Sequence, residues 1–264
     1  MTTTTTANGF YADDLLVTVD EQGEGRPVLL LHGGGGPPSM GPLPSALSER
    51  FHVIAPVHPG FAGTARPEWF DGIDDIALCY LQLLEQRDLR DVLVIGSSIG
   101  GWMASEMAVR EHERISGTVL LNAVGINVEG VALADFFSLT PQELITYSFH
   151  DPAAAPDPTQ LPQAARDIQA ANAATLGVYA REPYMHDPKL RRRLALVPTP
   201  VLAIWGESDQ IAPEPYGRAY AASFPDGRFE PIPAAGHLPH LEQPDRVLEA
   251  IHRFAHETTR STTK

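Results

Sequence analysis

The chain has very little cysteine, and its one thiol is Cys79. A single thiol cannot form a disulfide within the chain. Cys79 falls in a stretch whose apolar residues recur at helical spacing, and no glycine turn surrounds it. We therefore interpret Cys79 as a packing residue rather than a nucleophile. With 264 residues, 43% of them hydrophobic, the chain is long enough for one large domain with a sizeable core.

Basic side chains are also scarce. Lysine and arginine together number 19, against 33 aspartates and glutamates, and the formal net charge is -14. Such a charge disfavours nucleic acid and anionic membrane surfaces as partners, and we attribute it to solubility. Apolar runs of transmembrane length are missing, and the threonine-rich start, residues 1–9, has neither the basic nor the apolar part of a signal peptide. We expect a cytoplasmic protein without membrane contact.

What the sequence does contain is an alternation of strand-like and helix-like segments. Strand-like apolar runs occupy residues 15–19, 28–31, 53–57, 92–95, 118–121, 201–205 and 228–232. Helical patterns occupy residues 71–86, 102–110, 213–223 and 244–254. This alternation predicts an α/β fold, in which helices cover both faces of a mostly parallel sheet.

The alternation stops between the fifth and sixth strand-like runs, where the chain becomes rich in alanine, proline and aromatic residues. We interpret residues 127–196 as a helical cap, or lid, inserted into a core formed by residues 10–126 and 197–257. The small polar residues at the two ends, 1–9 and 258–264, are expected to be disordered.

A serine in a glycine-flanked turn carries the functional interpretation. Residues 96–101 read Gly-Ser-Ser-Ile-Gly-Gly and connect a strand-like run to a helix-like one. A chain that reverses so sharply leaves no room for side chains at Gly96 and Gly100. Ser98 has a glycine at both second-neighbour positions, whereas Ser97 does not. We therefore predict that Ser98 is a nucleophile.

Candidate partners of this serine follow other strand-like runs. Asp209 ends the segment Gly206-Glu207-Ser208-Asp209 after the sixth run, and Gly236-His237 follows the seventh. A serine hydroxyl is a poor nucleophile at neutral pH and needs a base to accept its proton. We predict that His237 is this base, and that Asp209 fixes the histidine tautomer and stabilises the imidazolium.

The order of serine, aspartate and histidine, each just after a strand, resembles the α/β-hydrolase superfamily. The resemblance includes His32-Gly33-Gly34, His58-Pro59-Gly60-Phe61 and the motifs described above, and it covers nearly the whole chain. It departs at Thr64-Ala65, where many relatives carry Gly-x-Ser, and this departure affects none of the predicted catalytic positions. The resemblance implies the α/β-hydrolase fold with an inserted cap.

The same resemblance implies an oxyanion hole. Its two donors would be the backbone N–H of Ile99, the residue after the nucleophile, and that of Gly34 in the glycine run. The neighbouring Gly35 is an alternative to Gly34.

The other interpretations of these motifs are weaker. Some relatives place the acid after the preceding strand, but Asn122 stands there and cannot carry the charge, which leaves Asp209. The paired histidines near the C-terminus do not enclose the glutamate of H-E-x-x-H, and the glycine run lacks the Lys-Ser/Thr of a P-loop. We expect neither a metal ion nor an organic cofactor.

These residues predict a cofactor-independent serine hydrolase of the carboxylesterase type, which cleaves an ester, thioester or lactone of a small to medium organic substrate. The cap residues Phe136, Phe137 and Tyr184 are predicted to line its apolar pocket. Ser98 argues against haloalkane dehalogenase and epoxide hydrolase chemistry, because those relatives use an aspartate there. A carbon–carbon bond hydrolase acting on ring-fission products, a lyase and a ligand-binding member of the fold all stay open, as does homo-oligomer formation.

Overall fold

The computed structural model describes residues 8–12, 15–111, 113–155 and 157–259. In these residues the chain forms an eight-stranded sheet with the order β1-β2-β4-β3-β5-β6-β7-β8. The strands are β1 (Asn8–Ala12), β2 (Leu15–Gln22), β3 (Pro27–Leu31), β4 (His52–Pro56), β5 (Val92–Ser97), β6 (Ile115–Leu121), β7 (Val201–Gly206) and β8 (Gly227–Ile232). The β1–β2 and β2–β4 pairs are antiparallel and all the others are parallel. The expected α/β fold is confirmed.

Nine helices occur in the described residues. They are α1 (Leu43–Ser48), α2 (Ile73–Gln86), α3 (Ile99–Arg110), α4 (Pro141–Ser148), α5 (Gln163–Ala180), α6 (Leu190–Leu194), α7 (Glu214–Ala221), α8 (Pro239–Glu242) and α9 (Pro244–Thr258). Short 3-10 helices lie at Pro37–Met40, Phe61–Gly63, Phe136–Ser138, Pro152–Ala154 and Pro158–Gln160.

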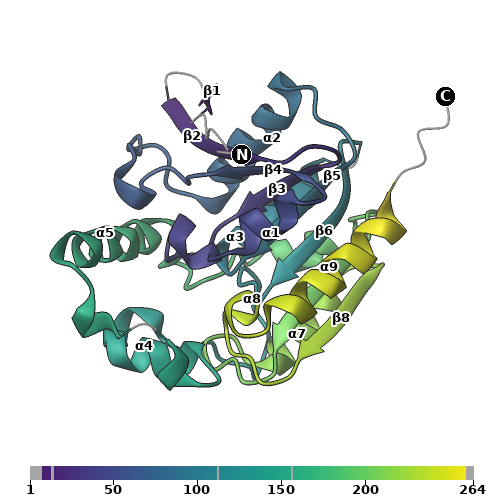
Figure 1. Ribbon diagram of the computed structural model, residues 1–264. Helices are drawn as coiled ribbons and strands as arrows, with labels where there is room; N and C mark the ends of the chain where they lie inside the picture. The colour runs from purple at the N-terminus through teal and green to yellow at the C-terminus, as the bar shows by residue number, and fades with distance from the viewer. Residues whose placement is uncertain (1–7, 13–14, 112, 156, 260–264) are drawn as a thin grey trace.

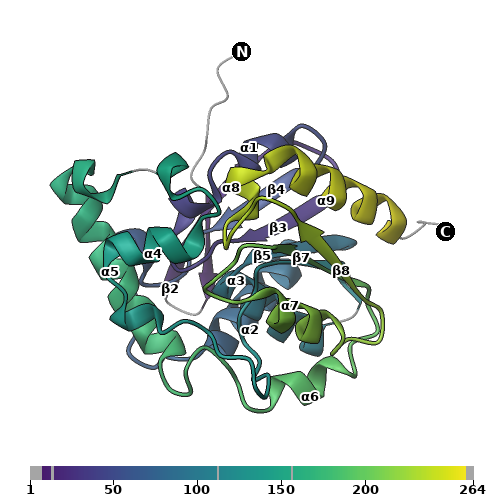
Figure 2. The ribbon, with the colours of Figure 1, turned by 90° about the horizontal axis from the view of Figure 1, so that it is seen from below.

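Helices cover both faces of the sheet because the strands send apolar side chains to each face in turn. In β5, Val94 packs in the core shared with α2 and α3, whereas Leu93 and Ile95 pack in the core shared with α1 and α9. Figure 2 shows α1 and α9 on one face and α2, α3 and α7 on the other. A strand that is buried on both faces reads as a continuous apolar run, which is why the sequence revealed these strands.

Among the described residues between β6 and β7, the regular elements are α4, α5, α6 and short 3-10 helices. In Figure 1, α4 and α5 stand away from the sheet. Contacts join α5 to the Phe61–Gly63 turn that follows β4. This helical segment corresponds to the region that we interpreted as a cap, and its division from the core at residues 127 and 196 stays a prediction.

The ends of the chain differ from the expectation of two disordered tails. Asn8 and Gly9 belong to β1, which pairs with β2. At the other end, Thr258 is buried in the last turn of α9, and its hydroxyl accepts a hydrogen bond from Arg26. Asn8 and Gly9 carry no apolar strand pattern, and Arg26 lies 232 positions from Thr258, so residue composition did not reveal these contacts. The rest of the two predicted tails lies outside the described residues, except Thr259, whose hydroxyl donates to the Ala255 carbonyl.

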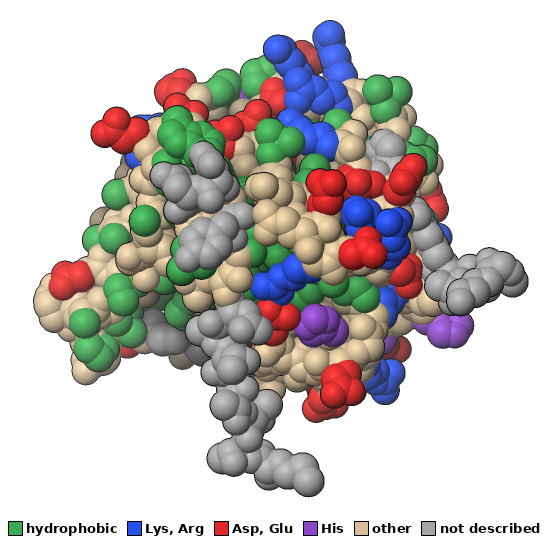
Figure 3. Space-filling model, turned by 90° about the horizontal axis from the view of Figure 1, so that it is seen from above, with side chains coloured by type: hydrophobic (Ala, Val, Ile, Leu, Met, Phe, Trp, Pro, Cys, Tyr) green, Lys and Arg blue, Asp and Glu red, His purple; other side chains and the backbone are tan. Residues whose placement is uncertain are grey.

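No helix in the described ranges is both long and apolar enough to cross a bilayer. Figure 3 shows acidic and basic side chains interspersed over one face of the molecule. Exposed ion pairs on the surface, such as Arg114 with Asp88 at 3.1 Å, contribute little stability each. The two apolar cores therefore hold the fold together.

Candidate active site

Ser98 occupies a strained turn between β5 and α3. Its φ of 53° and ψ of -115° lie outside the regions that non-glycine residues usually adopt. A Cβ on Gly96 would lie 2.1 Å from the Gly100 carbonyl oxygen, and a Cβ on Gly100 would lie 2.3 Å from the Leu31 carbonyl oxygen. The glycines are thus required for the close approach of β3, β5 and α3, and the turn raises Ser98 at the carboxyl end of the sheet.

Asp209 follows β7 and is held by four hydrogen bonds. Its Oδ1 accepts from the backbone N–H groups of Ile211 and Ala212, at 2.8 and 3.0 Å. Its Oδ2 accepts from His237 Nδ1 at 2.8 Å and from Asn122 Nδ2 at 2.6 Å. The carboxylate is buried, so the donors replace the water that an ionised group needs. This geometry fixes which oxygen faces the histidine.

Asn122 is a residue of this site that sequence reasoning missed. It follows β6, the strand between those that carry Ser98 and Asp209, and its φ of 45° is left-handed. Besides its bond to Asp209, it accepts from the Gly206 N–H at 3.3 Å through Oδ1. The sequence showed only that this amide cannot carry a charge. Its position directly after a strand was the feature from which a role in the site could have been predicted. Asn122 positions the acid instead of replacing it.

His237 lies in the loop after β8, against the C-terminal end of α4. Its backbone N–H donates to the Ser148 carbonyl at 2.7 Å. A carboxylate can only accept, so His237 Nδ1 carries the proton that Asp209 receives, and Nε2 is left as the basic nitrogen. Within the described residues, no hydrogen bond joins the Ser98 hydroxyl to His237. Catalytic contacts of this kind often tighten only when substrate binds.

The glycine loop after β3 lies beside Ser98. A Cβ on Gly33 would be 3.4 Å from the Cβ of Ser98. The Gly33 carbonyl accepts from His32 Nδ1 at 2.7 Å and from the Gly36 N–H at 3.0 Å. Because a trans peptide is planar, these bonds also fix the direction of the Gly34 N–H. Gly34, the next residue of this loop, is half-buried.

The second expected donor, Ile99, is the first residue of α3. Its N–H lies in the first turn of the helix, where a backbone N–H has no acceptor within the helix. The partial positive charge at this helix end also favours a developing oxyanion. The assignment of both oxyanion-hole donors stays a prediction.

A sequence profile of the Alpha/beta hydrolase family matches residues 28–250. The chain belongs to this family. The match spans the elbow, the glycine loop, Asp209 and His237.

Two relatives and one solved structure show the range of this hydrolase family. The chain is 28% identical over 262 residues to a putative non-heme bromoperoxidase BpoC of Mycobacterium tuberculosis, covering 89% of this chain and 95% of that protein. It is 26% identical over 255 residues to a 2-hydroxymuconate semialdehyde hydrolase of Pseudomonas putida, covering 90% of this chain and 89% of that protein. The solved structure of a meta-cleavage product hydrolase of Pseudomonas fluorescens matches with a TM-score of 0.80 at 24% identity, covering 95% of this chain and 97% of that one. This match supports the shared fold.

Two stacked histidines lie beneath the glycine loop of this hydrolase. The rings of His32 and His58 are 3.6 Å apart between centroids. His58 donates through Nε2 to the His32 carbonyl, and His32 Nε2 accepts from the His58 backbone N–H. Burial lowers the pKa of His32 to about 4, and burial followed by the neighbouring His32 lowers the pKa of His58. Both rings are therefore neutral at pH 7 and hold the loop through fixed tautomers.

His240 is buried as well, and it gives a prediction for how stability depends on pH. Burial lowers its pKa to about 4, and Nε2 donates to the Ser39 carbonyl at 2.9 Å. Between pH 6.5 and 4 the unfolded chain binds more protons at this site than the folded one, so stability falls as the pH falls. His240→Gln should reduce the loss of unfolding free energy between pH 7 and pH 5 by about 2 kcal/mol.

Urea unfolding at the two pH values measures this effect. His256→Gln, at an exposed histidine of α9, is the matched control and should keep the wild-type pH dependence. An unchanged pH dependence in His240→Gln would show that His240 is not a neutral buried group.

The predicted pocket residues Phe136, Phe137 and Tyr184 lie together. Phe137 packs edge-on against both other rings, with centroid distances of 5.6 and 6.0 Å. Phe137 and Tyr184 line a cavity of about 400 Å³, whose other lining residues are Leu133, Asp135, Ser138, Arg181 and Glu182. Neither the triad nor Phe136 borders this cavity. The structure therefore joins the three rings to one another, and their role as a substrate pocket stays a prediction.

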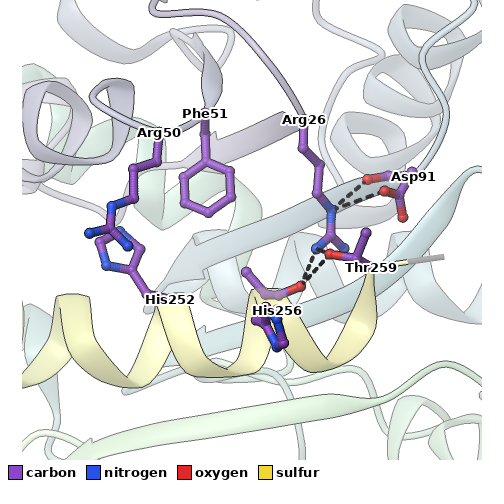
Figure 4. Close-up of a pocket in the computed structure, with 8 residues that line it drawn as sticks. Arg26, Arg50, Phe51, Asp91, His252, His256 and Thr259 are labelled. Carbon is purple, nitrogen blue, oxygen red and sulfur yellow. Dashed lines mark hydrogen bonds and ion pairs between the residues drawn. The ribbon is translucent and has the colours of Figure 1, made fainter. Parts of the chain in front are cut away.

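A second hollow, of about 230 Å³, lies near the amino-terminal ends of β3 and β5, whereas Ser98 stands at the carboxyl end of β5 (Figure 4). Arg26 and Asp91, which precede β3 and β5, border it together with His252 and His256 of α9. Arg26 donates to the Ala255 carbonyl and to Ser116, and so holds the last turn of α9 against the sheet. Within the described part of the chain, no group of three or more His, Cys, Asp or Glu residues could hold a metal ion.

Proposed function

We propose that this protein is a cofactor-independent serine hydrolase that cleaves an ester, thioester or lactone of a small to medium organic molecule. The observation that carries the proposal is the buried 2.8 Å bond between Asp209 Oδ2 and His237 Nδ1, at the same sheet edge as the strained Ser98 turn. Asp209 keeps the proton on Nδ1, so that Nε2 can accept the proton of Ser98. Ser98 Oγ then bonds to the substrate carbonyl carbon.

Other groups of the site would stabilise the negative charge that this step creates. The carbonyl oxygen becomes an oxyanion, which the N–H groups of Gly34 and Ile99 would stabilise. His237 returns its proton to the leaving group, and water repeats the cycle on the acyl-enzyme. Asp209, the His237 ring and the Gly33–Gly34 peptide are held in place by the hydrogen bonds described above, so the bond between Ser98 and His237 is the catalytic contact that substrate binding must complete.

A fluorophosphonate probe and a panel of p-nitrophenyl esters test this proposal. The probe should label Ser98 in the native protein but not in heat-denatured protein, and acetyl to octanoyl esters should be hydrolysed. Absence of both labelling and turnover in a folded sample would exclude a serine hydrolase. Labelling without turnover would favour the ligand-binding or lyase alternatives.

The second candidate is carbon–carbon bond hydrolysis, favoured by the similarity to the 2-hydroxymuconate semialdehyde hydrolase. The same triad and glycine loop would serve either reaction. Following the absorbance of 2-hydroxymuconate semialdehyde separates the two. A kcat/KM for this compound well above that of every p-nitrophenyl ester would place the enzyme in the carbon–carbon class.

The aromatic cluster of the cap is proposed to select the substrate. Phe137→Ala should change the ratio of kcat/KM between p-nitrophenyl acetate and a bulky ester by about tenfold, since a methylene-sized contact contributes about 1–3 kcal/mol of discrimination. Truncation of this half-buried ring should also lower the melting temperature. Both quantities should be measured on Phe137→Ala, Phe136→Ala and Tyr184→Ala. A lower melting temperature with an unchanged ratio would assign the rings to the core of the cap alone.

A further inference from the structure

The cap helix α5 places one buried amide between two loops. The Asn172 side chain donates through Nδ2 to the Gly35 carbonyl at 3.1 Å, and its Oδ1 accepts from the Ala62 N–H at 2.8 Å. The residue is 2% exposed. A buried amide is destabilising unless both of its ends are hydrogen-bonded. Here each end holds a different loop, one after β3 and one after β4.

The contact with Gly35 reaches the predicted oxyanion donor through two rigid peptide units. The Gly35 carbonyl and the Gly36 N–H belong to one planar peptide, so holding the carbonyl fixes the direction of that N–H. The Gly36 N–H donates to the Gly33 carbonyl at 3.0 Å. This carbonyl is the other end of the peptide that carries the Gly34 N–H. The bond that Asn172 makes therefore supports one of the two hydrogen bonds that fix the direction of the Gly34 N–H.

The same helix face also packs directly on the glycine loop. A Cβ on Gly34 would lie 2.9 Å from Leu176 Cδ2, and a Cβ on Gly36 would lie 2.8 Å from Asn172 Nδ2. These two glycines leave the room in which α5 approaches the loop. The contact between cap and loop is thus both apolar and hydrogen-bonded.

We propose that Asn172 is a positioning residue for the oxyanion hole, through which the seating of the cap helix sets the direction of the Gly34 N–H. The inference rests on the proposed serine-hydrolase function, because the N–H has a catalytic role only if an oxyanion forms. It adds a role for the cap in the chemical step, separate from selecting the substrate.

Other polar contacts of α5 provide a matched control. Thr175, one turn after Asn172, donates to the Gly60 carbonyl at 2.9 Å, and Tyr179 donates to the Pro59 carbonyl at 3.0 Å. These bonds attach the helix to the loop after β4 and do not touch the glycine loop. Thr175→Val therefore removes one bond between α5 and the loop after β4 and leaves both bonds of Asn172 in place.

The experiment compares Asn172→Leu and Asn172→Asp with Thr175→Val. Asn172→Leu removes both bonds, whereas Asn172→Asp keeps an acceptor for the Ala62 N–H but loses the donor to Gly35. Both should lower kcat for a p-nitrophenyl ester by about 10- to 100-fold, with KM changed by less than about twofold, because a displaced donor stabilises the oxyanion poorly. Thr175→Val should keep kcat within about twofold of wild type.

A trifluoromethyl ketone provides a second readout. Ser98 Oγ adds to its carbonyl carbon, the serine proton passes to His237, and the carbonyl electron pair becomes an oxyanion in the hole. Affinity for this ketone should fall by about the same factor as kcat in the Asn172 variants, while affinity for the matching secondary alcohol, which cannot add, should not change.

The outcomes separate the two proposals. If wild type neither hydrolyses any ester nor binds the ketone, the serine-hydrolase function fails and this inference fails with it. If wild type is active, but the Asn172 variants lose only melting temperature or lose kcat no more than Thr175→Val does, the inference alone is overturned. Should Asn172→Leu not fold, Asn172→Asp and Asn172→Ser decide by the same comparison.

Discussion

Replacing Ser98 with alanine should reduce ester hydrolysis by about 10⁶-fold while the protein stays folded. The serine supplies the oxygen that bonds to the substrate carbonyl, and without it His237 has no proton to accept. The fold should tolerate the change, because Ser98 makes its backbone contacts through N–H and C=O groups that alanine keeps, among them the bond from its N–H to the Leu121 carbonyl at 2.9 Å.

The adjacent serine is the control for this variant. Ser97 is buried at the end of β5, and its hydroxyl has no hydrogen-bond partner among the described residues. Ser97→Ala should therefore keep most of the activity. The measurements are p-nitrophenyl ester turnover, fluorophosphonate labelling and the melting temperature. Retention of more than a few per cent of wild-type turnover in Ser98→Ala, with contaminating esterase excluded, would contradict the assignment.

The sheet and the elbow were predictable from the sequence because their causes are local. A parallel strand with two covered faces must be apolar throughout, and the runs at β5 and β7 show this directly. The turn at Ser98 needs small residues on both sides, so Gly96 and Gly100 indicate this turn in the sequence. The order in which Asp209 and His237 follow later strands then places them at the same sheet edge.

The elements that the sequence did not reveal are short or depend on distant contacts. Helix α1 has only six residues, two of them buried, which is too few for a helical period to be recognised. Asn122 meets Asp209 across 87 positions, and Asn172 meets Gly35 across 137. No spacing rule connects residues so far apart. The hydrogen bonds of these two amides became visible only when the sheet order and the seating of α5 were known.

Asp209→Asn should lower kcat/KM by about 10⁴-fold, because it forces the wrong histidine tautomer. The Oδ1 position accepts from the N–H groups of Ile211 and Ala212, so the oxygen of the new amide will lie there. Its NH₂ group then points at His237 Nδ1, which must become an acceptor. The proton moves to Nε2, and the imidazole can no longer accept the proton of Ser98.

The same geometry predicts a partial rescue. In Asp209→Asn the new NH₂ group also faces Asn122 Nδ2, which stands 2.6 Å from the Oδ2 position, so two donors oppose each other. Adding Asn122→Asp replaces one donor with a carboxylate at the strand end next to β7. There it can accept from the new amide and take over as the acceptor of the His237 Nδ1 proton, which restores the tautomer that catalysis needs. The double variant should have a kcat/KM about tenfold or more above that of Asp209→Asn, measured with one ester at pH 7 to 8. Asn122→Asp alone should lower activity, because two carboxylates then oppose each other.

Two outcomes would contradict these predictions. Near-normal kinetics in Asp209→Asn would show that another carboxylate orients His237. A double variant no better than Asp209→Asn would show that a charge after β6 cannot reach the imidazole.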